Sequence, residues 1–161
     1  MNKILGIFIV LIACISCSKA GEQVYTQSID GAWNKKQIKN FEFTIDNPQE
    51  PKNLIFVVRN NNDYPYSNLR LIVELSDEKG KEKIKDTLNY DLAKPNGEWL
   101  GSGFGEVKEI LFQYKMGFTF PKAGTYKLDV IQAMRKDNLE GIEDIGIMIE
   151  SAKTATTING K

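Results

Sequence analysis

The stretch that decides the fold is LRLIVEL, residues 69–75. Its apolar residues alternate with period two, as they do in a strand that buries one face. The residues that would share the buried face are Leu69, Leu71, Val73 and Leu75. No segment of the domain around it sustains the 3.6-residue period of a helix. The stretch therefore predicts a β-strand that packs against a core.

The chain on both sides repeats this pattern. Strands are expected over residues 41–45, 54–58, 84–92, 109–120, 126–134 and 142–150. Turn-forming residues separate them, most clearly at 77–81 and 121–124. The expected inward residues include Ile84, Leu88 and Tyr90 in one strand and Ile145, Ile147 and Ile149 in another. Short strands at this spacing predict an all-β fold, a single antiparallel β-sandwich that is Ig-like or jelly-roll-like.

The first residues have the layout of a cleaved lipoprotein signal peptide. Lys3 precedes the apolar run ILGIFIVLIA, residues 4–13, which is too short to span a bilayer. The chain becomes polar directly after Cys17. We therefore expect a signal peptide over 1–16, an acylated N-terminus and tether over 17–22, the sandwich over 23–152 and a disordered tail over 153–161.

Two cysteines compete for the lipid. Leu11-Ile12-Ala13-Cys14 matches the usual acylation pattern better by residue type, but cleavage there would leave an unusually short signal. We favour Cys17, with Cys14 as the alternative, and an ordinary signal peptide without lipid stays open. An acylated N-terminus would hold the protein on a membrane.

The composition excludes several classes of function. The 161 residues include 21 Lys and Arg against 21 Asp and Glu, a balance that does not point to nucleic acid. Histidine is absent, which excludes Ser-His-Asp and Cys-His catalysis and the usual zinc sites. Both cysteines lie in the signal region, so the sandwich has no disulfide. Paired-carboxylate hydrolysis, Ser-Lys chemistry and an all-oxygen calcium site stay open.

One candidate binding region is VVRNNNDYPYSNL, residues 57–69. Tyr64 and Tyr66 could form an exposed aromatic ledge for a glycan or a protein partner, with Arg59 beside it. Alternatively, the tyrosines pack over the end of the sandwich and Arg59 has a structural role, which we favour.

A second candidate region is GEWLGSGFGE, residues 97–106. Its glycines do not have the spacing of a nucleotide-binding loop. Gly101 and Gly103 could allow a tightly turned structural segment with Trp99 at the edge of the core. Alternatively, Trp99 and Phe104 anchor a partner.

A third element comprises residues 132–141. Arg135 there could form a structural ion pair with Asp137, Glu140 or Asp144. No pattern places two carboxylates across a substrate, and no cofactor, metal site or catalytic residue is predicted. The sequence gives no indication of a small-molecule ligand.

In order along the chain, these elements resemble the gliding-motility lipoprotein family, GldH type, of the Bacteroidota. The resemblance is carried by Val58-Arg59-Asn60, by YPYSNL (64–69), by GEWLGSG (97–103), by QAMR (132–135) and by LEGIEDIG (139–146). It implies a non-catalytic lipoprotein of the cell envelope, in the outer membrane and facing the periplasm. It also implies an accessory role in gliding motility and the associated protein secretion, with other envelope proteins as partners. The alternatives are a glycan-binding lipoprotein and a carboxylate-based envelope hydrolase.

Overall fold

A computed structural model describes residues 22–152, and this part of the chain is all-β, as predicted. The signal segment, both cysteines and residues 153–161 lie outside the described residues. The strands are β1 (Gln23–Ser28), β2 (Ala32–Asn34), β3 (Lys39–Ile45), β4 (Lys52–Asn60), β5 (Asn68–Asp77), β6 (Lys83–Asp91), β7 (Lys108–Phe118), β8 (Gly124–Gln132), β9 (Asn138–Glu140) and β10 (Ile142–Ser151).

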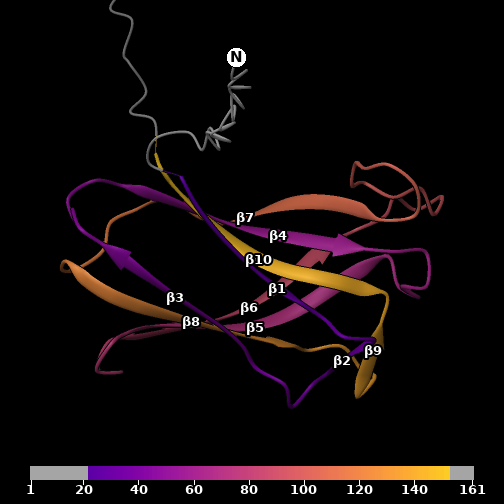
Figure 1. Cartoon of the computed structure of the whole chain (residues 1–161), viewed down its shortest axis with the longest axis horizontal. Coiled ribbons are helices and arrows are strands. Elements are labelled where there is room, and N and C mark those ends of the chain that lie inside the picture. Colours follow the sequence, from indigo (N-terminus) through magenta and orange to yellow (C-terminus); the bar gives the residue numbers. More distant parts are fainter. Residues whose placement is uncertain (1–21, 153–161) are drawn as a thin grey trace, which may run out of the picture.

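Two four-stranded antiparallel sheets pack face to face as a sandwich (Figure 1). We call them the β4 sheet, with strand order β1-β10-β4-β7, and the β5 sheet, with strand order β3-β8-β5-β6. The short strands β2 and β9 pair with each other. Each connection between the eight longer strands crosses to the other sheet, except the β5–β6 hairpin. This interleaved order is that of a jelly roll and not of an Ig domain, which settles the alternative left open by the sequence.

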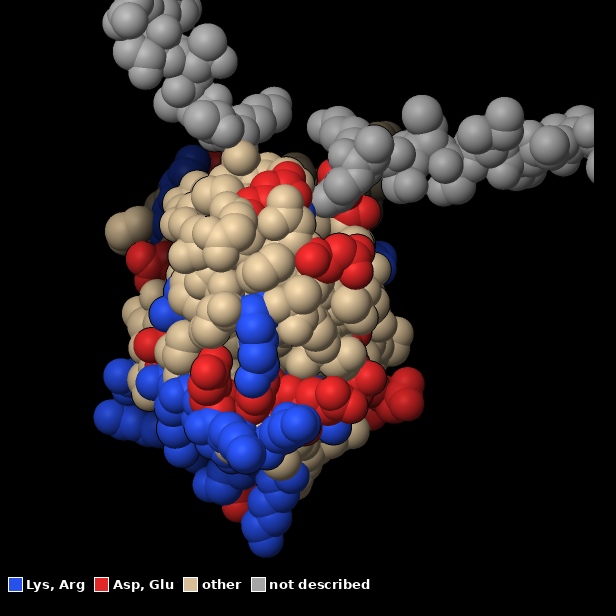
Figure 2. Space-filling view, turned by 90° about the vertical axis from the view of Figure 1, so that its left-hand side faces the viewer, with Lys and Arg blue, Asp and Glu red and all other residues tan. Residues whose placement is uncertain are grey.

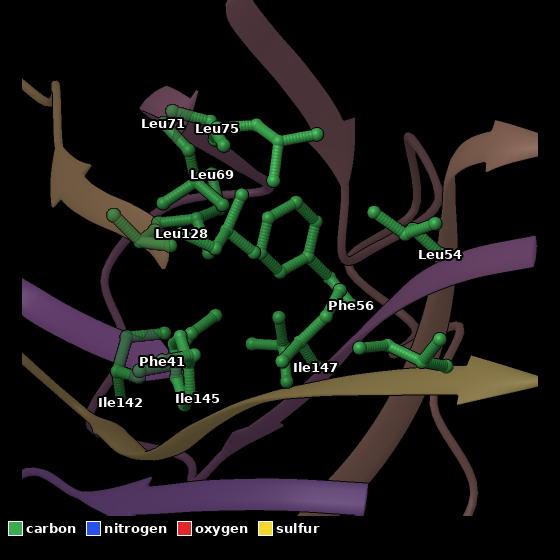
Figure 3. Close-up of a cluster of buried hydrophobic side chains, with 14 of the residues drawn as sticks. Phe41, Leu54, Phe56, Leu69, Leu71, Leu75, Leu128, Ile142, Ile145 and Ile147 are labelled. Carbon is green, nitrogen blue, oxygen red and sulfur yellow. The ribbon is translucent and has the colours of Figure 1, made fainter. Parts of the chain in front are cut away.

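The core lies between the two sheets and is filled from both (Figure 3). Phe56 of β4 is fully buried, and Ile145 and Ile147 of β10 lie on the same side of the β4 sheet. The β5 sheet contributes the four residues predicted from LRLIVEL, each at most 3% exposed: Leu69, Leu71, Val73 and Leu75. The alternation read from these strands is therefore confirmed.

The sequence was less informative at the edges of the sheets. Strands β1, β2 and β9 were not predicted, because β1 is a largely polar edge strand and the other two have three residues each. Ile84 was predicted to point into the core but is 37% exposed. It lies at the start of β6, an edge strand, opposite Leu75 at the end of β5, where little of the other sheet covers it.

The end of the sandwich that carries the β5–β6 turn is held together by a buried carboxylate. Asp77 is 2% exposed and accepts hydrogen bonds from the backbone N–H of Lys81 (2.7 Å) and from Lys122 Nζ (2.8 Å). Lys122 lies in the β7–β8 turn, so its contact with Asp77 joins this turn to the β5–β6 turn. Figure 2 views this end, where Lys and Arg side chains gather with Asp and Glu side chains beside them. Mixed charge of this kind is typical of a solvated surface.

The Asp77 contacts predict an acid-sensitive contribution to stability. The hydrogen bond from Lys122, together with those from the backbone of Glu82 and Lys81, lowers the pKa of Asp77 to about 2. A lowered pKa stabilises the fold above the carboxyl's ordinary pKa of 3.8, and this stability is lost as the pH falls through about 2. Asp77→Asn should therefore lower the melting temperature at pH 7 and reduce its fall between about pH 4 and pH 2. Glu42→Gln, which removes a carboxylate that is 3.9 Å from Lys127, serves as the control. Equal melting curves for Asp77→Asn and the wild type would contradict the assignment.

Candidate functional site

The two loops singled out in the sequence meet at the opposite end of the sandwich from the β5–β6 turn, on the right in Figure 1. Tyr64, in the β4–β5 loop, is only 3% exposed and donates a hydrogen bond from its hydroxyl to the carbonyl of Asn68 (2.8 Å). Burial raises the pKa of Tyr64 well above its usual range. Tyr64 therefore belongs to the core and does not form the exposed ledge considered from the sequence. Its burial agrees with the favoured interpretation, a tyrosine packed over the end of the sandwich.

Tyr66 and Trp99 pack around Tyr64 and leave part of their own surface exposed. The Tyr66 ring meets the Tyr64 ring edge to face at 5.9 Å, and the Trp99 ring lies 6.4 Å from it. The Trp99 indole N–H donates to the side-chain oxygen of Asn62 (3.1 Å). Trp99 thus fastens the loop between β6 and β7 to the loop between β4 and β5, as the structural interpretation of this residue proposed. We call Tyr64, Tyr66 and Trp99 the aromatic cluster.

The β6–β7 loop, residues 92–107, presents an apolar tip. Ser102 and Glu109 exchange two backbone hydrogen bonds of 2.9 and 2.8 Å, and Lys108 Nζ donates to the carbonyls of Gly103 and Gly105. Phe104, between these two glycines, is fully exposed. The loop is therefore held in shape by its own hydrogen bonds while its aromatic tip contacts solvent.

Gly101 and Gly103 lie where the two sides of the β6–β7 loop approach each other closely. A Cβ on Gly101 would lie 2.8 Å from the carbonyl oxygen of Glu109, and one on Gly103 would lie 2.5 Å from that of Val107. Both distances are far below van der Waals contact. Only glycine lets the two sides of the loop approach this closely.

The two arginines expected to be structural behave differently. Arg59 Nη1 lies 2.8 Å from Asp144 Oδ2, and Ser28 Oγ donates to the other oxygen of the same carboxylate. Arg135 does not form the ion pair expected with Asp137, Glu140 or Asp144 among the described residues. The reason is competition, because Asp137 is paired with Lys35 and Asp144 with Arg59. Arg135 instead lines an open cavity together with Arg70, a residue that the sequence analysis did not single out.

The described residues show no arrangement that indicates catalysis. Within residues 22–152, no group of three or more acidic side chains is placed to hold a metal ion. The buried Asp77 is paired with Lys122, and the half-buried Asp86 accepts a hydrogen bond from Tyr114 and is paired with Lys115. No helix in this part of the chain is long and apolar enough to cross a membrane.

Comparison with known proteins gives a consistent result over nearly the whole chain. The model of the GldH lipoprotein family matches residues 22–149. A gliding motility lipoprotein GldH homolog from Christiangramia forsetii is 44% identical over 164 aligned residues, which cover 94% of this chain and 99% of the relative. The gliding motility lipoprotein GldH of Flavobacterium johnsoniae is 36% identical over 152 residues, which cover 88% of this chain and 94% of the relative.

Similarity to solved structures is weaker. A crystal structure of dimeric latent PorU from Porphyromonas gingivalis aligns with 82% of this chain and 13% of its own, with 8% identity and a TM-score of 0.37. A similarity of this size identifies neither a function nor a site.

A matched pair of glycine substitutions tests how the aromatic cluster is supported. Gly141, between β9 and β10, and Gly31 have nearly equal φ angles of 79° and 78°. A Cβ on Gly141 would collide with the backbone nitrogen of Tyr64, whereas one on Gly31 would meet nothing within 4 Å. Gly31→Ala should therefore cost about 1 kcal/mol in unfolding free energy through backbone strain alone. Gly141→Ala should cost about 3 kcal/mol or more, because backbone must also move. Equal losses in chemical denaturation would contradict the close approach at Tyr64.

Proposed function

The chain belongs to the GldH lipoprotein family, and from this premise we propose that it is a non-catalytic accessory protein of the gliding motility machinery and of the protein secretion associated with it. It would be tethered to the cell envelope through lipid on Cys17, with the sandwich in the periplasm beneath the outer membrane. The observation that carries the proposal is the match of the family model to residues 22–149.

The tether supports a role beside membrane-bound partners. Strand β1 begins at Gln23, so few residues separate Cys17 from the sandwich. At about 3.5 Å per residue, a segment of this length can reach at most about 20 Å. The sandwich would therefore stay close to the membrane surface, where other envelope proteins can reach it.

The β6–β7 loop supports a docking role. Phe104 is fully exposed and Leu100 is 45% exposed, and both lie in a loop that its own hydrogen bonds hold in place. An exposed aromatic residue on a fixed loop can bury its area against a partner at a low cost in conformational entropy. We propose Phe104 as the anchor, with Trp99 as its support and not as a contact.

The same geometry disfavours the two alternatives. A glycan-binding site needs exposed aromatic faces, but Tyr64 is buried and Trp99 is half-buried against it. A glycosidase needs two free carboxylates across a cleft. The two buried carboxylates of the described sandwich, Asp77 and Asp144, are paired with Lys122 and Arg59. Docking therefore fits the side chains better than glycan binding or hydrolysis.

The docking proposal predicts separate effects of changing the Phe104 anchor and of removing the lipid tether at Cys17. Affinity-tagged protein, solubilised from membranes of its own cells, should co-purify gliding and secretion proteins. Phe104→Ser should reduce their recovery about tenfold, a loss typical of one aromatic anchor, and leave the melting temperature unchanged because Phe104 packs against nothing. Cys17→Ser should shift the protein from the membrane to the soluble fraction.

The matched control is Lys79→Ser, at the exposed β5–β6 turn on the opposite end of the sandwich. Its partner recovery should equal that of the wild type. Normal recovery with Phe104→Ser would show that the β6–β7 loop is not the docking surface. Recovery of polysaccharide without protein would favour the glycan alternative.

A further inference from the structure

Two arginines that form no ion pair among the described residues line a cavity to which the β6–β7 loop contributes no residue. The sequence contains three arginines, and Arg59 is neutralised by Asp144. The other two, Arg70 of β5 and Arg135 of the β8–β9 loop, are exposed and form no ion pair or side-chain hydrogen bond among the described residues. They line one open cavity of about 300 Å³ together with Tyr66, Asn68, Ala133 and Met134. Two arginines therefore line a shared space that has no acidic lining residue.

The loop that carries Arg135 is held in position by a buried side chain. Gln132 is 1% exposed, and its amide nitrogen donates to the carbonyls of Lys136 (3.0 Å) and Asp137 (3.3 Å). Its amide oxygen accepts from the N–H of Met134 (2.9 Å). The N–H of Ala133 donates to the carbonyl of Arg70 (2.8 Å) and so ties the loop to β5. The backbones that position the two arginines are thus fixed relative to each other before any ligand binds.

From this arrangement we propose that the Arg70–Arg135 cavity binds a carboxylate of an acidic, extended segment of a partner protein. A guanidinium group matches a carboxylate with two parallel hydrogen bonds, which makes arginine well suited to recognise this group. Met134, Ala133 and the half-buried ring of Tyr66 would cover the methylene groups of the acidic side chain.

The cavity fits a carboxylate better than a phosphate. Phosphate sites commonly use free backbone N–H groups, but those of Arg70, Ala133 and Met134 already donate within the protein. Asp91, opposite Asn68 in the register of β6 and β5, adds negative charge nearby and would repel a doubly charged group more strongly.

The neighbouring surface favours a peptide over a glycan. Ile72 lies two residues after Arg70 on the same face of β5 and lines a second cavity of about 240 Å³. The other lining residues of this cavity are the apolar Ile38 and Ile131 and the charged Glu74, Lys85 and Asp129. Side chains two residues apart on a strand are about 7 Å apart. An extended peptide has the same repeat, so an acidic residue in the first cavity would place an apolar residue, two positions along, over Ile72. A glycan would need aromatic faces, and Tyr66 is the only aromatic residue that lines either cavity.

A binding measurement on the full-length protein in detergent tests the proposal. The probe is a short fluorescent peptide in which glutamate and leucine lie two positions apart, and fluorescence anisotropy gives its Kd. A matched peptide with glutamine in place of glutamate should bind about tenfold more weakly. Arg70→Gln and Arg135→Gln should each weaken binding of the acidic peptide by about tenfold and reduce its salt dependence.

The controls separate this site from general charge effects. Lys127→Gln removes one positive charge from the same face of the β5 sheet and should leave the Kd within about twofold. Arg70 and Arg135 are exposed, so the melting temperatures of their variants should match that of the wild type. Inorganic phosphate and a uronic-acid polymer are tested as competitors. Equal binding of the two peptides, unchanged binding by both arginine variants, or binding of phosphate or the polymer without the peptide would overturn the proposal.

This inference deepens the proposed function, because it names the chemistry of a partner. Its test, however, needs no envelope protein. If the peptide does not bind, the co-purification result for Phe104→Ser is unaffected. If Phe104→Ser does not reduce partner recovery, the measured Kd of the peptide is unaffected.

Discussion

The structure depends on filling one apolar core from two sheets without a covalent cross-link. Phe56 and the isoleucines of β10 meet the leucines of β5 across the sandwich (Figure 3). Because all but one of the connections between the longer strands cross from sheet to sheet, strands that pair are distant in sequence, as β1 and β10 are. The core therefore forms only when nearly the whole domain is assembled, which is typical of folds with high contact order. The loops at the two ends of the sandwich lie outside this core, and their side chains differ.

The two ends of the sandwich differ in the side chains that they expose. At the β5–β6 turn, Asp77 and Lys122 fasten two turns within a surface of mixed charge (Figure 2). At the opposite end, Tyr66 contacts Tyr64 in the aromatic cluster and also lines the arginine cavity. Trp99 continues the same cluster into the loop that presents Phe104. The loop tip and the arginine cavity therefore share one rigid support, and a single partner could contact both.

Periodicity in the sequence predicted the central strands because a central strand buries a complete face, as LRLIVEL does. It could not predict β1, β2 or β9, since an edge or three-residue strand buries too little to produce a pattern. Tyr64 and Tyr66 show the corresponding problem in a loop. YPY predicts an extended segment that could pack over the sandwich end, but the sequence does not distinguish the buried Tyr64 from the half-buried Tyr66. The sequence did not mark Arg70 as a binding residue, because a polar residue is common at an outward-facing position of a strand. Its importance arises from the register that brings Ala133, and with it Arg135, beside β5.

The central claim is that the end of the sandwich that carries the β6–β7 loop and the arginine cavity contacts protein partners in the envelope. In-cell photo-crosslinking tests it most directly, with a photoreactive residue placed at position 104, at position 70 or at position 79. Crosslinks to gliding and secretion proteins from positions 104 and 70, with none from position 79, are the predicted result. Crosslinks of equal yield from position 79, or none to any protein from position 104, would contradict the claim.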